Sequence, residues 1–80
     1  MIKKCESEKT IIMVTITIFL KEIREKKGLS IRQLALMSGI SKSQISKIER
    51  GEAIPSILVL CQLADALHVE PEALYEYRKV

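Results

Sequence analysis

Aromatic residues are scarce in this sequence, and Trp is absent altogether. Phe and Tyr together make up only 4% of the 80 residues, although 48% of the residues are hydrophobic. The core must therefore be built from aliphatic side chains. A chain of this length forms one small domain, which buries only about 60% of the surface that its unfolded chain exposes.

Histidine and cysteine are also few. His68 is the only histidine, and Cys5 and Cys61 have neither metal-ligand spacing nor a His or Cys partner nearby. There is no Ser/His/Asp set and no phosphate-cradling Gly loop. We therefore expect no enzyme, no catalytic residue, no metal and no cofactor, and no small-molecule ligand is evident. Cys61 lies in an apolar helical run and is predicted to be buried, which fits a reducing cytoplasm.

No hydrophobic run is long enough to span a bilayer. Residues 10–19, TIIMVTITIF, are apolar but short, are interrupted by threonines and continue directly into Lys21 and Glu22. They also lack the small-residue cleavage site of a signal peptide. The sequence thus predicts a cytoplasmic protein that does not enter a membrane.

The same stretch has the pattern of a β-strand. In residues 14–18, VTITI, β-branched apolar side chains alternate with threonines. A single strand is not stable in water and needs a partner. One candidate is the C-terminal stretch 74–80, LYEYRKV, which also alternates. The other is the same strand of a second subunit, paired across a two-fold axis, and this is the interpretation we favour.

The net charge is only +3, but the charges are unevenly distributed. Residues 20–50 hold eight Lys and Arg against three Glu, whereas residues 51–80 hold two Lys and Arg against five Asp and Glu. A basic middle followed by an acidic end suits a protein that turns one face toward a polyanion. Such charges also occur on ordinary solvated surfaces, so the distribution is not specific by itself.

Residues 31–50, IRQLALMSGISKSQISKIER, predict two short helices joined by a glycine turn. Ser30 can cap the first helix, and Gln33 can complete a capping box. Gly39 ends that helix because it adopts a positive φ without steric cost. Ser41 can then cap the second helix.

The two helices of this segment have distinct inner and outer faces. The small Ala35 allows a close helix crossing, and Ile45 and Ile48 point inward. The outer face of the second helix is polar and cationic, and carries Lys42, Ser43, Ser46, Lys47 and Arg50. Such a pair of helices can present the second one to the major groove of DNA, although each feature alone also occurs in ordinary helical bundles.

These features resemble the lambda-repressor-like, Cro/C1-type helix-turn-helix family of DNA-binding domains, also called the xenobiotic-response-element family. The resemblance covers about residues 19–76. The matching pieces are IREKKGLS at 23–30, LA at 34–35, SGIS at 38–41, ISKIERG at 45–51, Pro55 and LADALHV at 63–69. Ile31 departs from the family, where a Gln that contacts the DNA backbone is common at this place.

The resemblance implies an all-α fold of five helices, to which this chain adds an N-terminal β-strand. We divide the chain into an arm and strand at 1–17, a helix-turn-helix domain at 18–77 with its motif at 31–50, and a tail at 78–80. The first helix is expected at 18–27, the fourth after Ser56, and a short fifth at Pro71. The fourth helix is apolar nearly all round, and its predicted core stripe is Ile57, Leu60, Leu63, Ala64 and Leu67.

The resemblance also implies an ion pair inside the domain. Arg24 lies on the inward side of the first helix, and in the family an Arg at this place pairs with a Glu near the end of the recognition helix, here Glu49. A desolvated charge is tolerable only when it is paired. The alternative is that both are independent surface charges.

We assign the expected DNA contacts by position on the two helices. Lys47 is suited to guanine and Gln44 to adenine, although a capping-box role would compete for Gln44. The full set of predicted base contacts is Lys42, Ser43, Gln44 and Lys47. The predicted phosphate contacts are Ser30, Arg32, Gln33, Ser46 and Arg50.

These assignments predict a sequence-specific DNA-binding transcriptional regulator. We expect a homodimeric repressor that reads the major groove of double-stranded DNA at a palindromic operator. The alternative is a protein-interaction module, such as an antitoxin that neutralises a partner protein, with DNA binding secondary. In that case the N-terminal strand and the apolar fourth helix would be the working surfaces.

Overall fold

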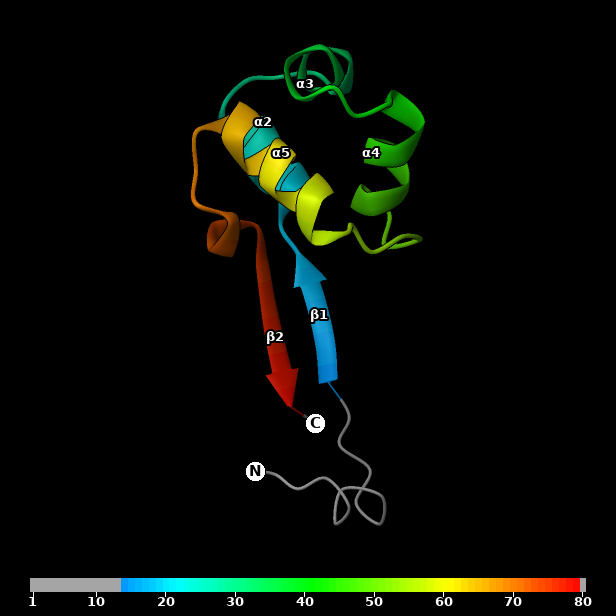
Figure 1. Ribbon diagram of the computed structural model, residues 1–80, viewed down its shortest axis with the longest axis vertical. Coiled ribbons are helices and arrows are strands. Elements are labelled where there is room, and N and C mark those ends of the chain that lie inside the picture. The colour runs from blue at the N-terminus through cyan, green and yellow to red at the C-terminus, as the bar shows by residue number, and fades with distance from the viewer. Residues whose placement is uncertain (1–13, 80) are drawn as a thin grey trace.

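Helices form one end of the molecule, and a long two-stranded ribbon extends from them (Figure 1). The computed structural model describes residues 14–79. Within these residues it contains four α-helices, one 3-10 helix and two strands. In chain order they are β1 (Val14–Ile18), α2 (Leu20–Lys26), α3 (Ile31–Ser38), α4 (Lys42–Glu49), α5 (Ile57–Leu67), η1 (Pro71–Leu74) and β2 (Tyr75–Lys79). We call residues 20–74 the head and the paired strands β1 and β2 the ribbon.

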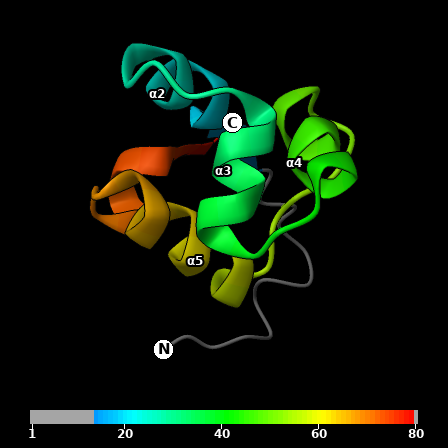
Figure 2. The same cartoon turned by 90° about the horizontal axis from the view of Figure 1, so that it is seen from above.

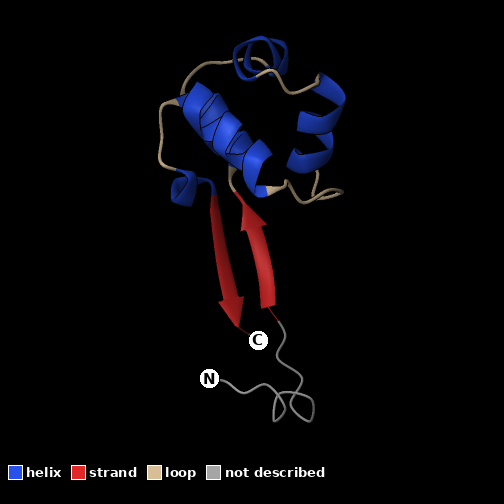
Figure 3. Cartoon of the chain, in the orientation of Figure 1, coloured by secondary structure: helices blue, strands red, loops and turns tan. Residues whose placement is uncertain are grey.

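The core lies between the helices of the head and is aliphatic, as the composition predicts. Leu34 from α3, Ile45 from α4 and Leu67 from α5 are each fully buried. Leu74, the last residue of η1 before β2, is also fully buried. Helices and strands occupy separate parts of the molecule, as Figure 3 shows. The buried apolar residues are Leu20, Leu34, Ile40, Ile45, Ile48, Leu63, Ala64, Ala66, Leu67 and Leu74.

The ribbon joins two segments from opposite ends of the described chain. Strands β1 and β2 pair antiparallel, with Val14 opposite Lys79 and Ile18 opposite Tyr75. At its base, the N–H of Phe19 donates to the carbonyl oxygen of Leu74 at 2.8 Å. The predicted N-terminal strand is thus confirmed. Its partner in the structure is the C-terminal stretch of the same chain, and not the strand of a second subunit that we had favoured.

The predicted fold is confirmed in part: residues 14–79 are mostly helical, but they contain four α-helices and not five, together with a small sheet. Pro71 does open a helical segment, but this is a 3-10 helix of only four residues, Pro71–Leu74. From Tyr75 the backbone is extended and pairs with β1. Pairing with a strand that is distant in sequence therefore overrides the local helical signal at Pro71, and the fold is mostly helical with a small sheet.

Two predictions of burial on α5 are also wrong. The side chain of Ile57 is 81% exposed, and Cys61 is exposed as well. Since α5 is apolar nearly all round, its sequence does not show which side packs inward. Leu63, Ala64 and Leu67 are buried as predicted, and Leu60 is half-buried.

Among the helices of residues 14–79, none combines the length and the apolar character that crossing a membrane requires.

Candidate nucleic-acid interface

The start of α3 is fixed by the predicted capping box. The Ser30 hydroxyl oxygen accepts a hydrogen bond from the backbone N–H of Gln33 at 3.0 Å. The Gln33 side-chain oxygen accepts one from the backbone N–H of Ser30 at 2.8 Å. Two amides that would otherwise lack partners at the helix terminus are satisfied in this way. Both side chains stay exposed. The cap uses only their oxygens, as acceptors, so the Ser30 hydroxyl hydrogen and the Gln33 side-chain NH2 remain available to donate to a phosphate.

A glycine turn and a second cap then set the direction of α4. Gly39 ends α3 with φ +80°, as predicted, and its N–H donates to the Ala35 carbonyl oxygen at 2.9 Å. The Ser41 hydroxyl accepts from the backbone N–H of Gln44 at 3.1 Å. The reciprocal bond from the Gln44 side chain is not formed among the described residues. The side-chain amide of Gln44 is therefore not used in the cap, although its backbone N–H is.

Helix α4 is held from beneath by its two isoleucines. Ile45 is completely buried and Ile48 is 2% exposed. Viewed from above, α4 lies at the edge of the head, with α3 beside it (Figure 2). Because the inner face is fixed, the outer face has only one orientation. The four predicted base-contacting side chains are all exposed on α4, and they are Lys42, Ser43, Gln44 and Lys47.

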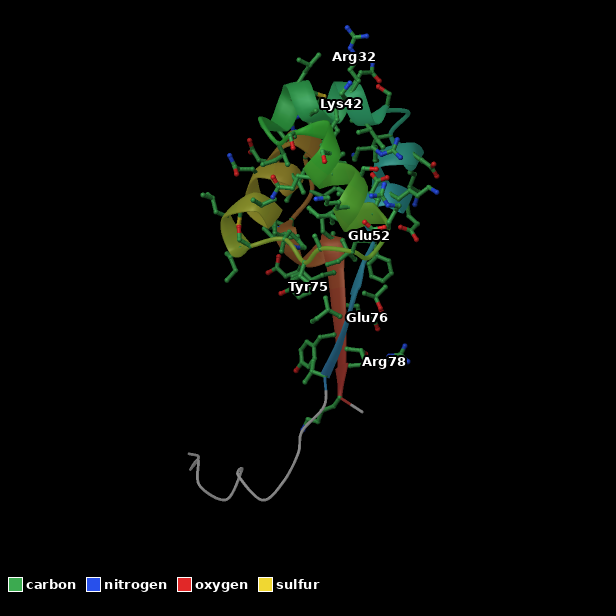
Figure 4. All side chains as sticks on the ribbon, turned by 90° about the vertical axis from the view of Figure 1, so that its right-hand side faces the viewer. Arg32, Lys42, Glu52, Tyr75, Glu76 and Arg78 are labelled. Atoms are coloured by element: carbon green, nitrogen blue, oxygen red, sulfur yellow. The ribbon has the colours of Figure 1, made fainter. Side chains whose placement is uncertain are left out.

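Cationic side chains from α3 and α4 meet at one end of this surface. Arg32 and Lys42 line the same hollow between the two helices, and both are exposed. Figure 4 shows them at the end of the head that lies farthest from the ribbon. Arg32, Lys42 and Lys47 form no ion pair with another residue of the described range 14–79. The structure thus brings a predicted phosphate contact next to a predicted base contact.

The predicted ion pair between Arg24 and Glu49 is present and almost fully buried. Arg24 Nε donates to Glu49 Oε2 at 2.7 Å, and Arg24 Nη2 donates to Oε1 at 3.1 Å. The side chains are 9% and 6% exposed. The hydrogen bonds to Glu49 raise the pKa of Arg24, while burial acts in the opposite direction. Arg24 Nη1 also donates to the Leu29 carbonyl oxygen at 2.8 Å, so one side chain links α2, the following turn and α4.

The sequence reasoning did not identify Glu52 as a partner of Arg50. Arg50 Nε and Nη2 donate to the Glu52 carboxylate at 2.9 and 3.0 Å, and Nη1 donates to the Ser46 hydroxyl at 2.6 Å. These hydrogen bonds lower the pKa of Glu52 and raise that of Arg50. The pair is about half exposed. Two predicted phosphate contacts, Ser46 and Arg50, thus already share an internal network, for which the only sequence signal is an acidic residue just beyond the helix end.

The sequence and the fold of this chain are both similar to those of known helix-turn-helix proteins. The family model described as "Helix-turn-helix" matches residues 20–74 of this chain. An uncharacterized HTH-type transcriptional regulator of Mycobacterium tuberculosis is 47% identical over 57 residues, which are 71% of this chain and 41% of the relative. The HTH-type transcriptional regulator SlrR of Bacillus subtilis is 48% identical over 54 residues, 66% of this chain and 36% of SlrR. The chain thus spans about two fifths of the length of these relatives.

Solved structures give the same result. The restriction-modification controller protein C.AhdI from Aeromonas hydrophila superposes with a TM-score of 0.63 at 42% identity, over 65% of this chain and 79% of C.AhdI. A transcriptional regulator from Vibrio cholerae superposes with a TM-score of 0.66 at 39% identity, over 68% of this chain and 30% of that one. By its sequence and by its fold, this chain belongs to the Cro/C1-type helix-turn-helix family.

Proposed function

We propose that this protein is a transcriptional regulator that binds double-stranded DNA with α4 in the major groove. The observation that carries the proposal is the division of α4 into two faces. Ile45 and Ile48 are buried, while the lysines and polar side chains opposite them are exposed. A helix that reads base edges is held by its domain on one side and exposes the other side to the groove.

Base readout is assigned to the exposed face of α4, as the sequence predicts. Lys47 lies one turn after Lys42 and is suited to bond guanine O6 and N7. Gln44 is suited to adenine, and its side chain is free of the capping bond that would compete. Ser43 lies beside Lys42 at the start of the helix. Both can reach base edges or the adjoining phosphates.

Phosphate contacts are assigned to the rim around α4. Arg32 is free of ion pairs with other described residues and is the strongest candidate. Ser30 and Gln33 lie at the start of α3, where free amides also favour an anion. Arg50 already donates to Glu52 and Ser46, so it offers a phosphate fewer N–H groups, and less net positive charge, than an unpaired arginine would.

The named roles of the relatives support regulation of transcription, and one favours repression. The matched proteins are named as transcriptional regulators, and RghR of Bacillus subtilis, 39% identical over 56 residues, is named a repressor. A single head makes few contacts, so we infer that a homodimer binds a palindromic operator. Its two α4 helices would lie about 34 Å apart, one turn of DNA, on equivalent half-sites.

Salt-dependent binding to random duplex DNA tests the proposal. If cationic side chains replace counterions on phosphates, log affinity should fall linearly with log salt concentration, by about 0.9 for each phosphate contacted. Affinity that does not change with salt, or no binding at low ionic strength, would contradict the proposal. That result would favour the second candidate, a module that neutralises a protein partner, for which the exposed apolar side chains of α5 are the supporting observation.

Two substitutions separate base readout from phosphate contact. Lys47→Ala should change which duplexes are selected from a random pool, because it removes a base contact. Arg32→Ala should weaken binding to all duplexes to a similar extent and reduce the salt dependence by about one phosphate. Both side chains are exposed, so neither change should affect folding. A uniform effect of Lys47→Ala would show that its assigned role is wrong.

A further inference from the structure

An apolar groove lies where the ribbon joins the head. Its apolar lining includes Ile16, Ile18 and Tyr75 from the ribbon and Ile54, Ile57 and Cys61 from the head. Two of these side chains are exposed to an unusual degree, Ile57 at 81% and Ile54 at 67%. Apolar surface that is contiguous and exposed in this way commonly marks a protein-protein contact.

The groove continues along one face of the ribbon. Residues directly opposite in an antiparallel pair share a face, so Tyr77 lies on the same face as Ile16, and Lys79 on that of Val14. Tyr77 is 62% exposed and Val14 is 49% exposed. The other face carries the polar Thr15, Thr17, Glu76 and Arg78. Since a two-stranded ribbon is only marginally stable in water, its apolar face needs cover.

Charges are placed at the two ends of this face. Glu70 and Glu72 are exposed and line the groove at the head, whereas Lys79 lies at the far end of the ribbon. The face is therefore acidic at one end and basic at the other. If a second copy packs in the reverse direction, the basic end of each copy lies against the acidic end of the other. A two-fold interface requires a surface that is complementary to itself in this way.

The position of α4 is compatible with this packing. Figure 4 looks onto α4, with α5 to one side and the ribbon leading away from the head. A two-fold axis along that line of sight reverses the ribbon and turns the groove of one copy toward that of the other. Both α4 helices then stay on the same side, as a palindromic site requires. The requirement that both α4 helices lie on the same side rests on the proposed function, whereas the packing of the ribbons does not.

We propose that the groove is a homodimer interface in which the ribbons of two copies pack antiparallel. Tyr77 of each ribbon covers the partner's groove, and Lys79 lies against the partner's Glu70 and Glu72. The surface offers fewer residues than the roughly 20–30 on each side of a standard interface. We therefore expect dimerisation to be reversible and to depend on protein concentration.

Sedimentation of the full chain without DNA tests the interface. The wild-type chain should change from monomer to dimer as its concentration rises. Ile57→Lys should raise the dimer dissociation constant at least tenfold. The matched control is Leu36→Lys, because Leu36 is 78% exposed but lies on α3, away from the groove. A monomer at every concentration, or equal behaviour of the two variants, would overturn the proposal and leave the groove to another protein.

Disulfide cross-linking tests the antiparallel arrangement. In a background of Cys5→Ser and Cys61→Ser, the pair Glu72→Cys and Lys79→Cys should form disulfide-linked dimers on oxidation, whereas each single substitution should not. Within one chain the two positions are separated by the length of β2, about 3.3 Å per residue, which is too far for a disulfide. Cross-linking by a single variant, or none by the pair, would overturn the arrangement.

These outcomes are independent of DNA binding. A cross-linked dimer that does not bind duplex DNA would contradict the proposed function and leave the interface intact. A chain that binds DNA but remains a monomer in solution and does not cross-link would contradict the interface and leave the proposed function intact.

Discussion

Replacing Glu49 by Ala should destabilise the protein severely. The change removes both oxygens that accept hydrogen bonds from Arg24, whose side chain is 9% exposed. Arg24 keeps its hydrogen bond to the Leu29 carbonyl oxygen and a longer ion pair, 3.9 Å, with the exposed Glu25, which is the weaker of its two acidic partners. Leaving a buried charge without its partner costs about 3–5 kcal/mol. The total stability expected for 80 residues is only about 4–12 kcal/mol. Each kcal/mol lowers the melting temperature of such a domain by about 4–8 °C, so we expect a fall of about 12 °C or more.

Thermal unfolding followed by far-UV circular dichroism, at one fixed protein concentration, measures this effect. Glu52→Ala is the matched control, since it also breaks an Arg–Glu pair, but an exposed one, and should change the melting temperature little. The double variant Arg24→Met with Glu49→Leu should recover much of the loss, because it leaves no unpaired charge. Equal melting of Glu49→Ala and the control, or no recovery in the double variant, would refute the reasoning.

Three further predictions concern the turn at Gly39, the helix cap at Ser41 and the DNA-binding surface near Arg50. Gly39→Ala should cost about 1–2 kcal/mol of stability through its positive φ alone, because the space around a Cβ there is open; Gly39→Asn should cost less in the same melting assay. Ser41→Ala should cost about 1 kcal/mol, since the Gln44 N–H loses its acceptor. Glu52→Gln should release Arg50, tighten binding to duplex DNA and steepen its salt dependence by about one phosphate. Because Arg50 holds the pKa of Glu52 below its ordinary value, acid would have the same effect only below the usual carboxylate range.

The parts of the structure that were predicted correctly depend on short-range signals. Ser30 and Ser41 cap their helices because each is followed by a helix whose amides need acceptors within three residues. Ile45 and Ile48 are buried because their spacing places them on one side of a helix. The Arg24–Glu49 pair followed from the family resemblance and not from the spacing of the residues.

The wrong predictions concern features that local sequence does not determine. These features depend on residues far away in the chain or on a selection among several similar faces, partners or rotamers. Helix α5 is apolar on most sides, so nothing local shows that Ile57 and Cys61 face outward. Two stretches could pair with β1, and only the path of the whole chain decides between them. Glu52 lies beyond the helix, where the rotamers of two exposed side chains determine whether Arg50 is paired.

The ribbon closes a loop that contains nearly the entire chain, since it joins Val14 to Lys79. Contacts so remote in sequence form late in folding, because the entropy of closing the loop must be overcome first. The backbone amides of β1 and β2 should therefore exchange with deuterium sooner than those of α5, even when the head is fully folded. If two ribbons pack together as proposed, that protection should increase with protein concentration, and the order of the ribbon would then report the extent of assembly.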